Sequence, residues 1–254
     1  MELIKYRELL GIWIGREIKI RYKQSFLGAA WAILQPLALM LVFTLVFSRF
    51  VQVPTDGIPY PVFSYTAVLP WTFLATAIAF GVPSLVSNMN LVTKTYFPRE
   101  ILPLGAIGAS FVDFIVASSI FVVMLYIYDV QLTSFALWVP VLLLLQILLT
   151  IGITLLASSI IVFYRDVRFI VPIALQLWLY ATPIIYPASL VPESLRTLYA
   201  LNPMVGIIEG YRATLLFGQP PPNSIIVSAV VSVFLVALGY FMFKRLEPSF
   251  ADII

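Results

Sequence analysis

The run LWVPVLLLLQILLTIGITLLASSIIVFY, from Leu137 to Tyr164, holds no charged residue and ends directly before Arg165. A helix of this length can cross a hydrocarbon core of about 30 Å, which needs about 20 apolar residues. In the whole chain of 254 residues, 61% are hydrophobic and 11% are charged, with a mean hydropathy of +1.02. Soluble domains carry about 25% charged residues. The sequence therefore predicts an all-α polytopic membrane protein.

Five other apolar runs complete a set of six predicted transmembrane helices in one domain, 1–254. The six spans are residues 31–50, 62–86, 103–126, 137–164, 169–186 and 224–243. Charges interrupt the apolar residues of 1–23 at helical intervals, which predicts an amphipathic helix lying in the membrane interface. The apolar pieces of 187–223 are too short to span, so this segment predicts a re-entrant pair of extracytoplasmic helices between the fifth and sixth spans.

The distribution of positive charge predicts how the chain is oriented. Twelve of its fifteen Lys and Arg residues lie in 5–23, 94–99, 165–168 and 244–245. Lys and Arg near span ends are retained on the cytoplasmic side. We therefore expect both termini in the cytoplasm, with Arg49, Arg196 and Arg212 outside. This bias also explains the net charge of +3 without a nucleic-acid partner.

Missing residue types narrow the chemistry that the chain can perform. It has no Cys, which excludes disulfides and thiolate metal sites, and no His, the usual general base and metal ligand. It also lacks a Gly-x-x-x-x-Gly-Lys-Ser/Thr loop, so it cannot cradle the phosphates of ATP itself. We expect no catalytic residue, metal site or cofactor in this chain. A membrane enzyme acting on lipid-linked sugars would need clustered carboxylates or His in an aqueous loop.

A few polar residues lie inside the predicted spans, where each needs a partner. Gln35 and Pro36 interrupt the first span, so this part is expected to face protein or water. Gln146 and Gln176 are expected to form interhelical hydrogen bonds. Asp113 is the lone acid deep in a span, and the sequence suggests no buried cationic partner for it. A structural hydrogen-bonding role is favoured, while a proton relay keeps a proton-coupled secondary transporter open as an alternative.

Four stretches together resemble the permease subunits of type-2 ABC exporters. They are YKQSFLGAAWAILQP (22–36), LPWTF (69–73), KTYFPRE (94–100), and Asn202-Pro203 followed by EGYR (209–212). The resemblance covers almost the whole chain and is closest to the branch that exports O-antigen, capsule and teichoic-acid polymers, above all to the O-antigen permeases. The shared motifs do not separate these cargoes, and a multidrug permease of the same type stays an alternative.

The resemblance implies an exporter of lipid-linked O-antigen polysaccharide in the bacterial inner membrane. Such a permease forms a homodimer with two copies of a nucleotide-binding subunit, which binds ATP and Mg. By resemblance, the interface helix and two other segments contact this ATPase. Those segments are Lys94, Thr95, Tyr96, Phe97, Pro98 and Arg99, together with Phe26, Leu27 and Gly28. A gate at the channel exit is implied for Asn202, Pro203, Glu209, Tyr211 and Arg212.

The cargo suggests further candidates. A sugar polymer is bound by aromatic faces and hydroxyl partners, and weak sites in series let it slide. Many aromatic residues of this chain belong instead to the membrane interfaces. The channel-lining candidates are Tyr22, Trp31, Tyr65, Trp71, Phe73, Tyr180 and Tyr186. Lys19, Arg21 and Lys23, beside the first span, are candidates to receive the carrier's polyprenyl pyrophosphate, although an ordinary basic flank explains them equally well.

Overall fold

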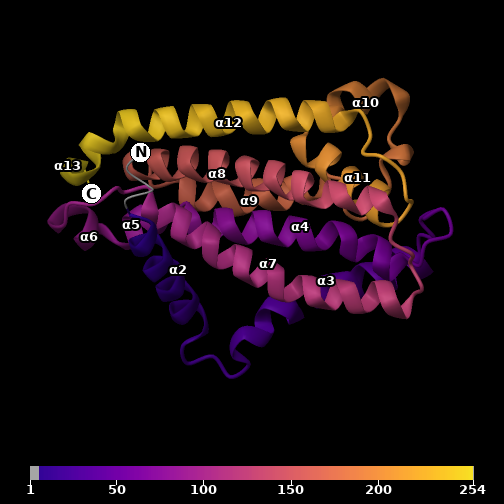
Figure 1. Ribbon diagram of the computed structural model, residues 1–254. Helices are drawn as coiled ribbons and strands as arrows, with labels where there is room; N and C mark the ends of the chain where they lie inside the picture. Colours follow the sequence, from indigo (N-terminus) through magenta and orange to yellow (C-terminus); the bar gives the residue numbers. More distant parts are fainter. Residues whose placement is uncertain (1–5, 254) are drawn as a thin grey trace.

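The computed structural model describes residues 6–253, and these form helices joined by turns, with no strand among them. The longer helices are α2 (Arg7–Tyr22), α3 (Trp31–Phe43), α4 (Tyr60–Gly81), α7 (Ile101–Ile127), α8 (Val139–Phe163), α9 (Val167–Tyr180), α11 (Pro203–Leu215) and α12 (Ser224–Leu246). The shorter ones are α5 (Ser84–Ser87), α6 (Met89–Lys94), α10 (Glu193–Ala200) and α13 (Phe250–Ile253). Figure 1 shows α4, α7, α8 and α12 running along one bundle axis, with α2 angled away from it.

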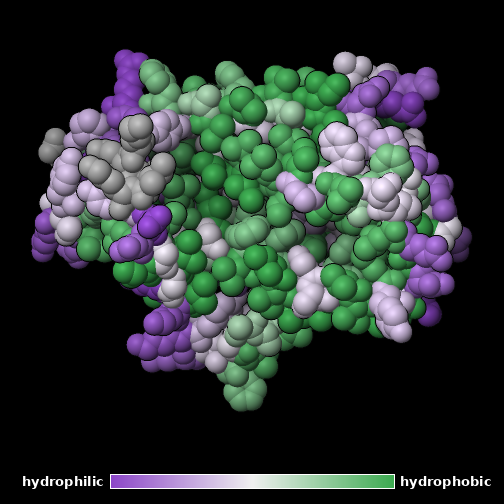
Figure 2. Space-filling model, viewed as in Figure 1, coloured by the Kyte–Doolittle hydropathy of each residue, from purple (hydrophilic) through white to green (hydrophobic). Residues whose placement is uncertain are grey.

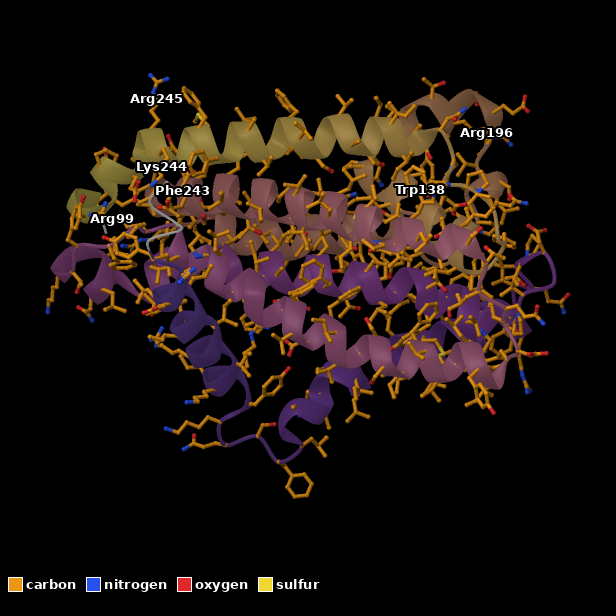
Figure 3. The ribbon with its side chains drawn as sticks, in the orientation of Figure 1. Arg99, Trp138, Arg196, Phe243, Lys244 and Arg245 are labelled. Atoms are coloured by element: carbon orange, nitrogen blue, oxygen red, sulfur yellow. The ribbon has the colours of Figure 1, made fainter. Side chains whose placement is uncertain are left out.

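The bundle has an apolar middle and two polar ends. On the face shown in Figure 2, apolar residues cover the middle and hydrophilic residues gather at both ends. We call the end that holds α5, α6 and α13 the terminal end, and the end that holds α10 the far end (Figure 1). Arg99 and Lys244 lie at the terminal end and Arg196 lies at the far end (Figure 3). Among the described residues, five helical stretches are long and apolar enough to cross a membrane, which confirms a multi-pass membrane chain.

Glycine lets α8 and α12 pack backbone against backbone. A Cβ built on Gly239 would lie 2.3 Å from the carbonyl oxygen of Gly152, and one on Gly152 would lie 2.5 Å from the carbonyl carbon of Leu235. Small residues at helix crossings permit this close approach in membrane proteins. Gln146 of α8 joins two more helices, because it donates to the carbonyl oxygen of Pro70 at 2.7 Å and accepts from the Tyr211 hydroxyl at 3.2 Å. The interhelical role predicted for Gln146 is confirmed.

The run predicted as the fifth span behaves differently from the other five. Helix α9 covers only Val167–Tyr180, about 21 Å at 1.5 Å per residue, which is too short to cross the membrane by itself. Residues 182–185 are buried without helical structure. Their backbone finds side-chain partners: Tyr60 donates to the carbonyl oxygen of Ile185 at 2.8 Å and Arg212 to that of Ile184 at 2.9 Å. A continuous helix over 169–186 is therefore not confirmed.

Candidate functional site

Helix α2 is docked on α7 through glycine. A Cβ on Gly105 would lie 2.2 Å from the Trp13 ring, and one on Gly108 would lie 2.5 Å from the Ile14 side chain. The two glycines, three residues apart, therefore form a groove on one face of α7 that accepts these two larger side chains. This contact holds the second half of α2 beside α7 and brings Arg21 to the depth of Asp113.

Arg21, Tyr22 and Asp113 form an ion-pair cluster between α2 and α7. The guanidinium of Arg21 lies 2.9 Å from one Asp113 oxygen, and the Tyr22 hydroxyl donates to the other at 2.7 Å. Arg21 also donates to Ser110 Oγ and to the carbonyl oxygen of Ala106, both at 3.0 Å. The Arg21 and Asp113 side chains are only 7% and 17% exposed. Burial, and then the bond to Asp113, raise the pKa of Tyr22, so its hydroxyl stays protonated as a donor.

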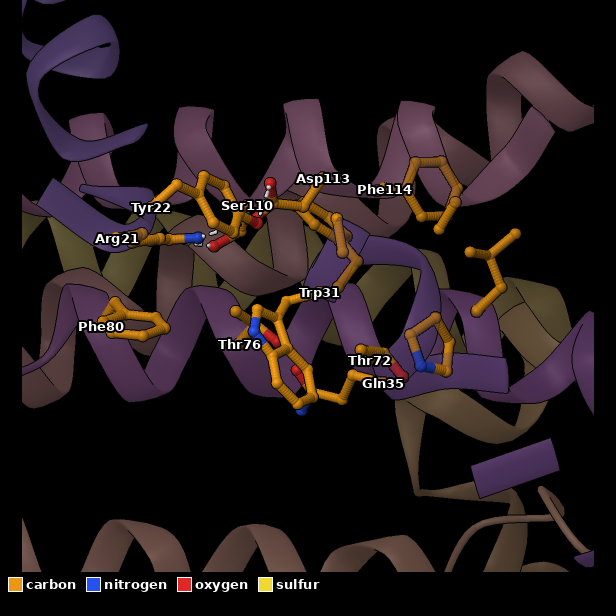
Figure 4. Close-up of a pocket in the computed structure, with 15 residues that line it drawn as sticks. Arg21, Tyr22, Trp31, Gln35, Thr72, Thr76, Phe80, Ser110, Asp113 and Phe114 are labelled. Carbon is orange, nitrogen blue, oxygen red and sulfur yellow. Dashed lines mark hydrogen bonds and ion pairs between the residues drawn. The ribbon is translucent and has the colours of Figure 1, made fainter. Parts of the chain in front are cut away.

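This cluster forms one wall of a cavity of about 190 Å³ that is lined by residues of α2, α3, α4 and α7 (Figure 4). Besides the cluster, the cavity is lined by aromatic rings and by hydroxyl and amide groups. These lining residues include Trp31, Gln35, Thr72, Phe73, Thr76, Phe80, Ser110 and Phe114. A space of this size has room for about six water molecules. Its rings, hydroxyls and amide suit a small ligand unit that carries hydroxyl groups.

A second group of charges joins the segment after α6 to the end of α12. Lys244 Nζ lies 2.8 Å from Glu100 Oε1 and 2.9 Å from Glu247 Oε2. The backbone N–H of Arg99 donates to Glu247 Oε1 at 3.1 Å, and its guanidinium donates to the Glu247 carbonyl oxygen. Glu100 is almost fully buried. Because this group combines several charges and backbone bonds, it fixes the Lys94–Glu100 segment against α12.

A third group lies toward the far end, around α11. Asn202 caps this helix by accepting from the backbone N–H of Met204 at 3.1 Å, and it also accepts from the Trp178 indole at 2.9 Å. The fully buried Arg212 pairs with Glu209 at 2.9 Å and stacks 3.7 Å from the centre of the Phe63 ring. The residues implied as a gate therefore bind α11 to α4, α9 and the irregular segment after α9.

Comparison with known proteins places the chain in a family. The profile of the ABC-2 type transporter domain matches residues 8–216. The chain belongs to the ABC-2 type transporter family. The resemblance noted in the four sequence stretches is thereby confirmed.

Relatives of this ABC-2 chain match it over most or nearly all of its length. The O-antigen export system permease protein RfbA of Myxococcus xanthus is 34% identical over 99% of this chain and 97% of its own length. A protein of the same name from Klebsiella pneumoniae is 27% identical over 97% of this chain and 95% of its own length. The polysialic acid transport protein KpsM of Escherichia coli is 23% identical over 80% of this chain and 79% of its own length.

The channel-lining candidates separate into two groups in this ABC-2 chain. Tyr65, Trp71 and Phe73 are buried inside the chain, where their rings pack against aromatic side chains of neighbouring helices, as Trp71 does against Trp178. Phe73 nevertheless lines the 190 Å³ cavity, and a channel-lining role for these three residues stays a prediction. The other four, Tyr22, Trp31, Tyr180 and Tyr186, are half-buried or exposed. Of these, Tyr22 and Trp31 line the 190 Å³ cavity.

The ATPase-coupling candidates also differ in their surroundings. Tyr96 is 95% exposed, whereas Phe97 packs against an internal cluster that includes Trp13 and Phe250. Phe26 is fully exposed, and Gly28 has a φ of +52°, which favours glycine in this turn. The turn between α2 and α3 projects away from α6 (Figure 1). The two coupling segments therefore do not form one continuous surface within this chain.

The structure corrects the expectation for Asp113. Arg21 is its buried cationic partner, although Arg21 lies 92 residues earlier in the chain and was predicted to be at the membrane surface. Of the three cations proposed to receive a pyrophosphate, Lys19 and Lys23 are exposed, whereas Arg21 is already paired. Gln176 is exposed and makes no hydrogen bond to another described residue, so its predicted interhelical bond within the chain is absent.

Proposed function

We propose that two copies of this chain, with two copies of a separate ATPase subunit, export lipid-linked O-antigen polysaccharide across the bacterial inner membrane. The observation that carries this proposal is the match to O-antigen export permeases over 97–99% of the chain. ATP and Mg are bound by the ATPase, because this chain has no phosphate-binding loop.

The surface of the chain offers a face for the second copy. Phe169, Ile170, Ile173 and Leu177 of α9 are each about 60% exposed and follow one face of this helix. Polar Gln176 and Tyr180 lie exposed in the same helix. Large exposed apolar faces mark contacts with lipid or with another chain. In the proposed homodimer, the α9 and α3 faces of the two copies enclose the export path.

The segment 187–223 supplies the proposed gate at the outer mouth of this path. Helices α10 and α11 contain 8 and 13 residues, about 12 and 20 Å, so neither is long enough to cross the membrane. Asn202 and Arg212 hold them to the end of α9, so a movement of α9 in the dimer would move both. We assign these two helices to a re-entrant pair on the extracytoplasmic side.

Deleting the gene for this chain from the host bacterium, while the ATPase and glycosyltransferase genes stay intact, tests the proposed function. We expect polysaccharide to disappear from the cell surface and lipid-linked polymer to accumulate inside, because synthesis continues without export. Surface and intracellular polymer are measured in the same culture, and a plasmid copy should restore export. Normal surface polysaccharide in the deletion strain would refute the proposed function.

Capsule export is the second candidate, because 80% of the chain aligns with a polysialic acid transport protein. The same deletion strain separates the two candidates. Loss of polymer linked to lipopolysaccharide indicates O-antigen export, whereas loss of a polymer that is not linked to lipopolysaccharide indicates capsule export.

The proposed orientation predicts which loops face the cytoplasm. An accessibility reporter should find residues 94, 166 and 250 inside and residues 56, 129 and 196 outside, because the basic patches stay in the cytoplasm. The contacts between α6 and α13 support this prediction, because they bring residues 94 and 250 to the same end of the bundle. Labelling of position 250 from outside intact cells would overturn this topology.

Substitution of Tyr96 is the sharpest test of the ATPase contact, because among the described residues its side chain is 95% exposed. Replacing Tyr96 with Ala should weaken association with the ATPase by about 2 kcal/mol, or about thirtyfold, as loss of an aromatic anchor commonly does. Co-purification at graded ATPase concentrations measures the change. Tyr126→Ala, an exposed tyrosine at the other end of α7, is the matched control. If the Tyr96→Ala variant binds the ATPase as tightly as the Tyr126→Ala control does, the contact lies elsewhere, and α2 is the next candidate.

A further inference from the structure

The geometry points to a groove between α3 and α4 that takes uncharged, hydroxyl-rich sugar units and disfavours polymers with an acidic group on each sugar. This inference rests on the proposed function and deepens it, because it names the class of polysaccharide. The groove is defined by Gln35, Thr72 and Thr76, which line both the 190 Å³ cavity and a neighbouring cavity of about 470 Å³ that reaches Leu179 of α9.

Polar groups form a stripe along this groove. Thr72 and Thr76 are four residues apart on α4, so they share one face of the helix, opposite Gln35 of α3 (Figure 4). Thr72 lies nine residues before Gly81, the last residue of α4. This distance is about 13 Å along the helix axis from the terminal end of α4. The stripe is therefore well inside a membrane-spanning helix, and the half-exposed Trp31 ring stands at its terminal-end side.

Two of these groups lack partners within the chain. Among residues 6–253, the side chains of Gln35 and Thr76 make no hydrogen bond, and Gln35 is exposed. Polar side chains at membrane depth face a bundle interior or a water-filled path, because lipid cannot bond to them. Sugar hydroxyls both donate and accept, so they match an amide and two hydroxyls. Only a few weak contacts are available, which permits binding without trapping a moving polymer.

The charges around the groove determine which polymer it favours. Of the residues lining the two cavities, only Arg21 and Asp113 are charged, and they are paired at 2.9 Å. An acidic sugar in the groove would therefore find no free cation, and a charge without a partner in a low-dielectric site is costly. The exposed Lys19 and Lys23 line a separate surface hollow beside α2. Positive charge is thus available outside the groove, where the carrier's pyrophosphate would be received, and not within it.

Reconstituted transport tests this inference with the whole complex. Proteoliposomes containing this chain and its ATPase are supplied with two lipid-linked polymers of equal length, one of neutral hexoses and one with a carboxylate on each sugar. We expect the neutral polymer to be transported about tenfold faster. Gln35→Leu combined with Thr72→Val and Thr76→Val should slow the neutral polymer about tenfold, because three hydrogen-bonding groups are lost. Ser119→Ala, which removes an exposed hydroxyl of α7 outside the groove, is the matched control.

Each outcome decides the inference. Equal transport of both polymers by the parent complex would refute the charge argument, and unchanged transport by the triple variant would show that the polymer does not contact the stripe. Loss of the dimer in the triple variant, measured by native mass, would identify the stripe as a subunit contact and overturn the inference. If the parent transports neither polymer, the proposed function itself fails, which distinguishes that result from the others.

Discussion

Replacing Asp113 with Leu lowers the free energy of unfolding by about 3–5 kcal/mol, because it leaves the buried Arg21 guanidinium without a counter-charge. Ser110 and the Ala106 carbonyl still accept from Arg21, but they cannot neutralise it. Since this pair fixes the end of α2 to α7, the variant should also lose the alignment of α2 and export little polymer. Thermal melting of the purified chain in detergent measures the loss of stability.

Two further variants distinguish the loss of the ion pair from a general effect of substitution on stability. Arg21→Met combined with Asp113→Leu removes both charges and should recover most of the stability, because no unpaired charge remains. Glu193→Gln breaks the exposed pair with Arg196 and should change stability by no more than about 1 kcal/mol. The losses in free energy of unfolding caused by Asp113→Leu alone and by Arg21→Met alone are added. If the double variant loses as much as this sum, the pair does not couple α2 to α7.

Replacing Gly239 with Ala destabilises the chain, although Ala is the better helix former. The added Cβ would lie 2.3 Å from the Gly152 carbonyl oxygen, and backbone atoms cannot move aside as a side chain can. Helices α8 and α12 must then separate along a contact between two membrane-spanning helices. Overpacking of this kind costs about 1–3 kcal/mol or more. The same detergent melting assay measures the effect.

Gly11→Ala is the matched substitution, because in residues 6–253 no atom outside the chain neighbours and the α2 backbone lies within 4 Å of a Cβ at this position. There the exchange should stabilise the chain by about 0.5–1 kcal/mol, since Ala loses less conformational entropy than Gly in a helix. We therefore expect the two Gly-to-Ala substitutions to change the free energy of unfolding in opposite directions. Stabilisation by both would contradict the close backbone contact between α8 and α12.

The long spans could be predicted from the sequence because a single property, an apolar run of sufficient length, defines each of them. The predicted span 224–243 corresponds to α12 (Ser224–Leu246), and 103–126 corresponds to α7 (Ile101–Ile127). The predicted span 169–186 is not confirmed as one continuous helix, for a physical reason. Pro183 follows the end of α9, and the carbonyl oxygens of Ile184 and Ile185 accept hydrogen bonds from the distant Arg212 and Tyr60 side chains, which no local pattern reveals.

The candidate site was less predictable, because its parts come from distant segments. Gln35 was recognisable as a polar residue at membrane depth, and Trp31 as a ring beside it. Arg21 looked like one cation among several, and only the docking of Trp13 and Ile14 on α7 brings it to Asp113. Tyr65 had the same aromatic character as Trp31, but its neighbours bury it completely. A hydropathy pattern gives depth, and it does not give the direction of a side chain between helices.

Movement of polymer by the purified complex tests the central claim most directly. The chain and its ATPase are reconstituted with their cytoplasmic faces outward, and lipid-linked O-antigen polysaccharide is added outside together with ATP. The account predicts that polymer becomes protected from an added glycosidase only when both subunits and hydrolysable ATP are present. Polymer that stays fully digestible with ATP, or that becomes protected without the ATPase subunit, would contradict the assignment of this chain as the permease of an ATP-driven polysaccharide exporter.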